Sequence, residues 1–159
     1  MKHWLIRAGD GKNFANSSRF QIWGVNTKDT HIIRFLKGVL PGDKLWVIKN
    51  GANGKVIAVV TYVSHNLREN DADQPLIRTT LTDEELGWDS KSGGKSNVEI
   101  HYTDLYNVSE CDLITGFIIR TTTLQYPSEH CKLNLEQEYT NIVKYSKLTR
   151  TMSTNTDSV

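Results

Sequence analysis

The sequence has few cysteines and no long apolar run, and each absence narrows what the chain can be. It holds only two cysteines among 159 residues, Cys111 and Cys131, and no export signal, which predicts reduced structural thiols and no disulfide. No stretch approaches the roughly 18 apolar residues that a membrane span needs, and the first apolar run is too short for a signal peptide. We therefore expect an intracellular protein, cytoplasmic or nuclear and not secreted, with no membrane partner.

Motifs that hold metals or phosphates are also missing. His130 and Cys131 are adjacent, His101 and Cys111 lie elsewhere, and no CxxC or HxxxH spacing exists. The glycines of GANGK at 51–55 lie between two predicted strands and do not open a helix, so they match neither a P-loop nor a dinucleotide fingerprint. The sequence therefore predicts neither a metal site nor a cofactor.

A strong net charge is absent too, but the average conceals an asymmetry. The formal charge of the whole chain is +1. Residues 1–60 carry ten basic and three acidic side chains, a net of +7, whereas residues 61–159 carry a net of −6. One part of the surface can thus be basic enough to meet phosphates, although the whole protein is nearly neutral.

The length predicts one domain, which we place at residues 1–147, followed by a disordered tail at 148–159 that is poor in large apolar residues. Runs of aromatic and β-branched residues predict strands at 3–8, 20–25, 44–50, 54–65, 98–108 and 116–126, with the 44–65 hairpin at the centre of a sheet. Helical spacing and capping residues predict helices at 29–38, 82–87 and 135–145. The segment 9–18 has loop composition. This order favours the α+β class, with a mixed sheet curled into a small barrel and helices outside it.

One predicted strand shows a clear alternation of apolar and polar residues. Val98, Ile100 and Tyr102 alternate with polar side chains from Glu99 onward. We therefore expect the polar side of this strand, Glu99 included, to face water.

The four tryptophans differ in their sequence context. Trp4 and Trp46 lie within apolar runs, which predicts burial in the core. Trp23 ends a predicted strand, and Trp88 follows the helix-ending Gly87 and opens a polar loop. If the planes of Trp23 and Trp88 face each other across about 7 Å, a flat base can stack between them. The alternative is that each indole plugs one end of the barrel.

The basic residues of the first part of the chain accompany Trp23 in sequence. Arg7, Lys12 and Arg19 lie in the same basic segment as Trp23 and are the candidates for phosphate contacts. Amide and backbone groups of the polar segment GKNFANSS are suited to reading the edge of a base.

These stretches resemble the EVE and YTH domains of the PUA-like group. HWLIRAGDGKNF through SSRFQIWGV resembles the first strand, loop and second strand of a YTH domain, and KLWVIKNGANGKVIAVVTYVS is similar to its central hairpin. GWDSKSGGKSNVEIHYTDLYNV resembles its later aromatic loop and the strand after it, and PGDKLWV is similar to EVE domains. The resemblance covers about residues 3–145 and implies a PUA-like mixed β-barrel flanked by short helices.

The resemblance also assigns roles to individual residues. Trp23 matches the cage tryptophan at the end of the second strand, and Trp88 matches the cage tryptophan of the later loop across a gap. Arg7 falls where YTH domains have a basic residue, and Asn13 falls on an asparagine of the loop beside the base.

The sequence departs from the YTH pattern at two positions. Gly9, with Asp10 beside it, replaces the asparagine that reads the adenine ring, and Gly24 replaces the serine after the first cage tryptophan. These differences argue against N6-methyladenosine and leave open another modified base, in RNA or in DNA.

Three functions from different classes follow. The leading hypothesis is a non-catalytic reader that holds a modified or flipped base of RNA, or of modified DNA, between the two indoles. A hydrolase or nuclease similar to ASCH domains would need Lys12, Asp10 and Glu99 to converge on one pocket. The third hypothesis makes the aromatic cleft a groove for another protein.

Overall fold

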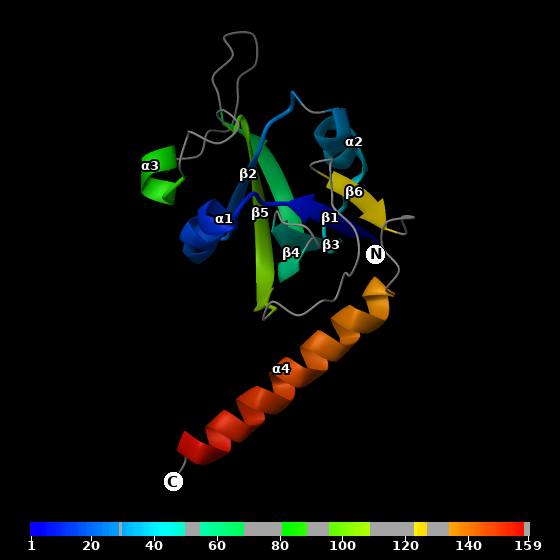
Figure 1. Ribbon diagram of the computed structural model, residues 1–159, viewed down its shortest axis with the longest axis vertical. Helices are drawn as coiled ribbons and strands as arrows, with labels where there is room; N and C mark the ends of the chain where they lie inside the picture. Colours follow the sequence, from blue (N-terminus) through cyan, green and yellow to red (C-terminus); the bar gives the residue numbers. More distant parts are fainter. Residues whose placement is uncertain are drawn as a thin grey trace.

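The computed structural model describes residues 1–28, 30–49, 55–68, 81–88, 96–108, 123–126 and 134–157. Strands and helices are interspersed along this part of the chain (Figure 1). In chain order the elements are β1 (His3–Arg7), α1 (Lys12–Ser17), the 3₁₀ helix η1 (Ser18–Phe20), β2 (Ile22–Val25), α2 (Thr30–Gly38), β3 (Lys44–Lys49), β4 (Lys55–Leu67), α3 (Asp83–Leu86), β5 (Val98–Asn107), β6 (Thr123–Tyr126) and α4 (Leu135–Asp157).

One mixed, curved sheet holds the molecule together (Figure 1). Its six strands run in the order β2-β5-β4-β3-β1-β6. β1 pairs with β3 in parallel, and the other neighbours are antiparallel. The α+β class with a mixed, curled sheet is therefore confirmed, and β3 and β4 occupy its centre as predicted. The turn between them, residues 50–54, lies outside the described residues.

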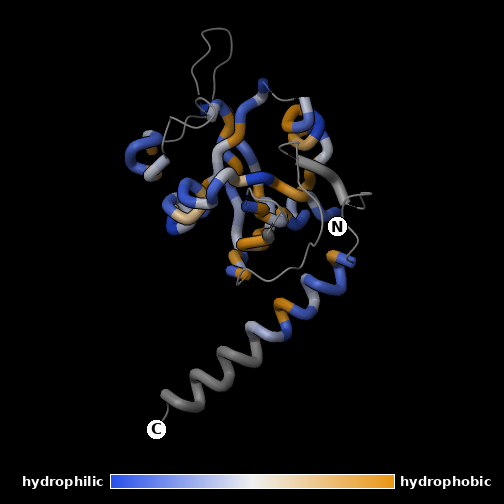
Figure 2. The backbone as a smooth tube through the Cα atoms, in the orientation of Figure 1, coloured by the Kyte–Doolittle hydropathy of each residue, from blue (hydrophilic) through white to orange (hydrophobic). Residues whose placement is uncertain are grey.

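Buried apolar residues lie on both faces of the sheet, which explains why β3 reads as an almost continuous apolar run. Figure 2 marks the hydrophobic residues along the backbone in orange. On one face, Trp4 and the α2 residue Phe35 belong to the larger cluster. On the other face, Trp46 and the α4 residue Leu135 belong to a second cluster, against which Tyr139 also packs. Burying a side chain such as Leu135 stabilises the fold by about 1.5–3 kcal/mol, so both helices are fixed by their apolar anchors.

The prediction of a loop at 9–18 is wrong, because α1 and η1 begin within this segment. Its glycines, asparagines and serines favour a loop locally. However, Phe14 and Ser17 lie three residues apart on α1, and both are buried. The Ser17 hydroxyl donates a hydrogen bond to the carbonyl of Ile22 at 2.7 Å, which ties α1 to the start of β2. Tertiary contacts thus override local propensity here.

The C-terminal helix is longer than the sequence predicts. α4 continues to Asp157, past the boundary at Lys147 where the tail was expected, and projects away from the sheet (Figure 1). Residues 147–157 include no Gly or Pro, so a helix that is anchored at its first turns extends at little cost. None of the helices in the described residues is long and apolar enough to cross a membrane.

Candidate functional site

Trp23 and Trp88, which are 65 positions apart in sequence, lie side by side at the β2 edge of the sheet. Their ring centroids are 6.2 Å apart and their planes meet at 78°. The expectation of parallel walls is therefore wrong: the edge of one indole contacts the face of the other, an arrangement that aromatic pairs prefer when nothing separates them. The two rings pack directly against each other, and each fills the space beside the other.

A short, well-capped helix positions Trp88. The predicted capping box is confirmed: the Thr82 side chain accepts from the Glu85 N–H, and the Glu85 side chain accepts from the Thr82 N–H. Gly87 ends the helix with φ +76°, a conformation that favours glycine. The Asn16 side chain of α1 donates to the Gly87 carbonyl at 2.8 Å. Trp88 is thus held against α1 by the residue that precedes it.

Gly24 supplies the space that Trp88 occupies. A Cβ atom at this position would lie 2.7 Å from Cη2 of Trp88 and 2.6 Å from the Ser96 hydroxyl, closer than real contacts allow. Gly24 is also the cross-strand partner of Glu99, so both positions lie on the same face of the sheet. Gly24, predicted as a contact to the base edge, therefore admits the Trp88 ring in this conformation.

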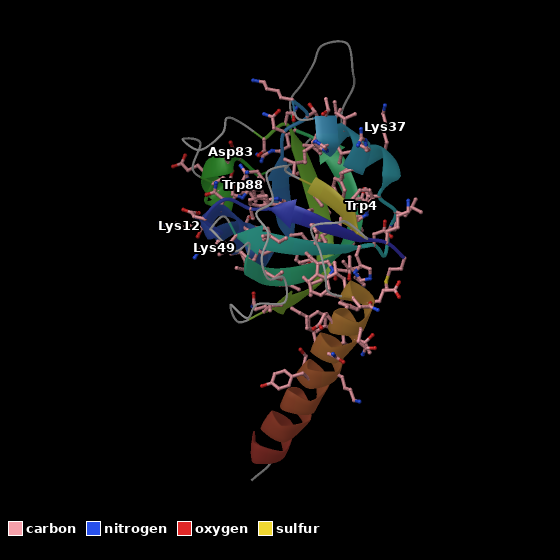
Figure 3. The ribbon with its side chains drawn as sticks, turned by 45° about the vertical axis from the view of Figure 1, so that its right-hand side comes forward. Trp4, Lys12, Lys37, Lys49, Asp83 and Trp88 are labelled. Carbon is pink, nitrogen blue, oxygen red and sulfur yellow. The ribbon has the colours of Figure 1, made fainter. Side chains whose placement is uncertain are left out.

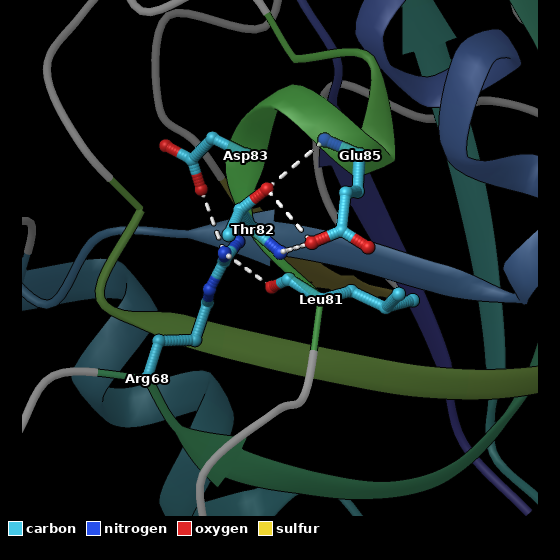
Figure 4. A network of polar contacts seen from close by, with 5 residues as sticks. All are labelled: Arg68, Leu81, Thr82, Asp83 and Glu85. Atoms are coloured by element: carbon cyan, nitrogen blue, oxygen red, sulfur yellow. Dashed lines mark hydrogen bonds and ion pairs between the residues drawn. The ribbon is translucent and has the colours of Figure 1, made fainter.

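Arg68 covers the face of Trp88, and no sequence pattern predicted this position. Its Cζ lies 4.6 Å from the centroid of the Trp88 ring, a cation–π contact. Nη2 forms an ion pair with Asp83 at 2.7 Å and donates to the Leu81 carbonyl at 3.3 Å (Figure 4). Its backbone N–H donates to Asn97 at 2.8 Å, which continues the ladder between β4 and β5. Only this long-range pairing brings Arg68 to the site.

Two further aromatic residues extend the cluster into the core. Phe14 of α1 contacts Trp23 edge to face, with centroids 5.6 Å apart, and stacks on Tyr102 of β5 at 5.7 Å. Burial raises the pKa of Tyr102 well above its ordinary value, so its hydroxyl stays protonated. Trp23 is consequently fixed from behind by Phe14, whereas Trp88 has a guanidinium on its face.

The prediction that the polar side of β5 faces water is wrong for Glu99, which is only 1% exposed. Asn66 and Gly24 flank it across the ladder, and Trp88 lies over Gly24. One carboxylate oxygen, Oε1, lies 3.2 Å from Nε2 of His101, and the Asn66 amide lies 3.3 Å from the same nitrogen. The other oxygen, Oε2, is buried and has no hydrogen-bond partner in the described part of the chain.

Five buried polar atoms of this cluster have no hydrogen-bond partner among the described residues: Trp23 Nε1, Trp88 Nε1, Arg68 Nη1, Glu99 Oε2 and the Tyr102 hydroxyl. Buried polar groups are nearly always hydrogen-bonded, and leaving one unpaired costs about 1–3 kcal/mol. Within the described residues the cluster therefore offers flat surfaces, unused donors on both indoles and the guanidinium, an unused carboxylate oxygen and an unused hydroxyl, all sealed from water in this conformation.

The predicted residues of the β1–α1 turn make local contacts. Gly9 has φ +53°, which explains the glycine, and the Asp10 carboxylate accepts from the Lys12 N–H at 2.9 Å. Lys12 is exposed on α1, on the same side of the molecule as Trp88 (Figure 3). Asn13, also on α1, is half-buried.

Arg7 and Arg19 are exposed on different elements. Arg7 ends β1, and Arg19 lies in η1 with its Cζ 4.6 Å from the Phe20 ring. Both remain available for contacts with an external partner.

No group of three His, Cys, Asp or Glu side chains that could hold a metal occurs within the described ranges. Cys111, His130 and Cys131 lie outside those ranges. No protein-family model matches the chain, and no curated protein shows significant sequence similarity to it.

Proposed function

We propose that the protein is a non-catalytic nucleic-acid reader of the EVE/YTH type, built on a PUA-like barrel. It holds a modified or flipped base, of RNA in preference to DNA, against Trp23 and Trp88. One observation carries the proposal: two indoles from distant parts of the chain meet at a sheet edge, and neither N–H has a partner among the described residues.

The right-angled packing of the rings requires a movement before a base can stack between them. The contact between the indoles is worth about 0.5–1.5 kcal/mol, and a cation–π contact with a desolvated arginine such as Arg68 is worth about 2 kcal/mol. Stacking of a base on an aromatic side chain contributes about 1–3 kcal/mol. A base that stacks on both indoles is therefore needed to offset the contacts that break when the Trp88 ring turns parallel to Trp23. Trp23 stays in place because Phe14 supports it.

The exposed cations supply the second part of binding. Lys12 lies on α1, which contacts α3, and Arg7 and Arg19 lie on the neighbouring β1 and η1. Phosphate contacts by such residues add affinity without base selectivity and weaken as salt rises. Each phosphate that they neutralise should make the slope of log K against log salt more negative by roughly 0.7 for a single strand.

The test is a titration of short RNA and DNA oligonucleotides, methylated and unmethylated, at fixed salt. We expect Trp23→Ala and Trp88→Ala to weaken binding of the preferred base about 5- to 150-fold, the equivalent of one lost stack. Tyr145→Ala removes an aromatic side chain that is 72% exposed on α4, and it should bind as the wild type does. Equal, weak binding of every oligonucleotide by wild type and both tryptophan variants would exclude the reader function.

A further inference from the structure

We propose that Arg68 is a latch: its guanidinium holds the two indoles closed, and a base enters only by removing the Trp88 ring from it. This regulation rests on the proposed reader function, because it acts on the same two indoles. The latch consists of the cation–π contact between Arg68 and Trp88, in which Cζ lies 4.6 Å from the ring centroid.

The Arg68 guanidinium is held in place by contacts that do not involve Trp88. Its Nη2 pairs with the Asp83 carboxylate at 2.7 Å and donates to the Leu81 carbonyl at 3.3 Å (Figure 4). The backbone N–H donates to the Asn97 carbonyl at 2.8 Å, which fixes Arg68 beside the end of β5. Only 8% of the Arg68 side chain is exposed, so solvent ions screen the ion pair weakly. The guanidinium is therefore anchored independently of the ring that it covers.

An open cage needs the Trp88 ring in a different orientation. The planes of Trp23 and Trp88 meet at 78°, and Phe14 supports Trp23 edge to face at 5.6 Å. Trp88 is thus the ring that turns. A turn of that size takes its face away from a guanidinium that stays with Asp83. Opening consequently breaks either the cation–π contact or the ion pair.

The closed form leaves hydrogen-bonding groups unused, and this favours opening. Five buried polar atoms of the cluster have no partner among the described residues, Nη1 of Arg68 and both indole Nε1 atoms included. Water that reaches such groups after the ring turns recovers part of the cost of burying them. The cation–π contact with a desolvated arginine acts in the opposite direction. Arg68 therefore sets the fraction of molecules that are open, and the apparent affinity falls in proportion to that fraction.

The latch predicts an effect whose sign is opposite to that of simple electrostatics. Arg68→Gln removes a positive charge, which by itself weakens binding to phosphates. If Arg68 holds the cage closed, the same variant should bind oligonucleotides about 10- to 30-fold more tightly, the equivalent of one desolvated cation–π contact. Because every base must open the same latch, affinities for methylated and unmethylated oligonucleotides should rise by the same factor.

The test titrates methylated and unmethylated RNA and DNA oligonucleotides into wild type, Arg68→Gln and Asp83→Asn at fixed salt. Asp83→Asn keeps the arginine but removes its ion pair, so we expect a gain in affinity smaller than that of Arg68→Gln. Glu84→Gln is the matched control, since it removes one negative charge from an exposed position of the same helix. Its gain should be smaller than that of Asp83→Asn, because only the general charge effect remains.

A second measurement reports opening without any oligonucleotide. Acrylamide quenches the fluorescence of exposed tryptophans, so Arg68→Gln should be quenched more strongly than wild type. The difference should disappear when Trp88→Phe is added to both proteins, since Trp4 and Trp46 are buried. Circular dichroism checks the fold, and Asp83→Asn decides by the same two readouts if Arg68→Gln does not fold.

The latch and the reader function fail in different ways. Weaker or equal binding by Arg68→Gln, while Trp23→Ala still loses affinity, would overturn the latch and leave the reader function in place. No dependence of binding on Trp23 would remove the reader function. Stronger quenching of Arg68→Gln would then still show that Arg68 closes the indole pair.

Discussion

The four tryptophans of this chain form two pairs with opposite hydrogen bonding. Trp4 and Trp46 are buried, and their N–H groups donate to a carboxylate at 3.2 Å and to a histidine nitrogen at 2.9 Å. Trp23 and Trp88 are half-buried, and within the described residues their N–H groups have no acceptor. The comparison therefore separates two tryptophans whose N–H groups are hydrogen-bonded in the core from two whose N–H groups are unused among the described residues.

The largest effect on stability is expected at Trp46, one of the two tryptophans buried in the core. Trp46→Ala removes a fully buried indole and should lower the free energy of unfolding by about 3–5 kcal/mol. Trp88→Ala removes a half-buried ring without a hydrogen bond among the described residues and should cost about 1–2 kcal/mol. Urea denaturation followed by circular dichroism measures both. Equal losses would contradict the division of the tryptophans into two classes.

The second prediction removes the acceptor of Trp4. Asp43 accepts from the Trp4 indole at 3.2 Å and from the Lys2 and Leu40 N–H groups at 2.9 Å each. Burial alone would raise the pKa of Asp43, but these hydrogen bonds outweigh it and the pKa lies below its usual value. Asp43→Ala leaves these donors unpaired and should cost about 2–3 kcal/mol in urea denaturation. Glu84→Ala, at an exposed position on α3, should cost much less.

A smaller effect is expected from a substitution beside the Trp88 ring. Gly24→Ala places a methyl group within 2.7 Å of the Trp88 ring, which must shift. The Ser96 Cβ is also 2.7 Å away and moves only with its backbone, so we expect a loss of about 2 kcal/mol, within the range for overpacking. Tryptophan fluorescence should change, and oligonucleotide affinity should fall. An unchanged emission spectrum would show that the indole does not lie over Gly24.

The smallest effect concerns pH and the partner of Trp46. Burial lowers the pKa of His3 from 6.5, and nearby Lys44 acts in the same direction. The unfolded chain therefore binds a proton on His3 more readily, so stability falls as pH drops from 6.5 to the folded pKa. We expect this histidine to contribute to the loss of stability between pH 7 and pH 5. His3→Gln should reduce the loss measured by urea denaturation, and an unchanged loss would exclude His3 as its source.

Much of the fold follows from local sequence signals. The central strands, α2 and the capping box of α3 were predicted because alternation, apolar runs and caps are written within a few neighbouring residues. α1 was missed because its stability comes from Phe14 and Ser17 reaching distant partners. The burial of Glu99 was missed because its strand is polar at alternate positions, although other elements cover that face.

The candidate site was predictable only in part. Trp23 and Trp88 stand out because each indole adjoins a glycine near the end of a predicted element. The angle between their planes depends on side-chain packing across β2, α3 and β4, which no local pattern specifies. Arg68 carried no sequence signal, since its position on Trp88 results from strand pairing with Asn97.

The position of β1 in the sheet has a consequence for synthesis of the protein. β1 lies between β3 and β6, so its two partners are Lys44–Lys49 and Thr123–Tyr126. During synthesis β1 emerges from the ribosome before both of its partners. At about 5–20 residues per second, several seconds pass before β6 follows. A chain truncated before Thr123 lacks the strand that pairs with one edge of β1, and such an edge is a template for aggregation.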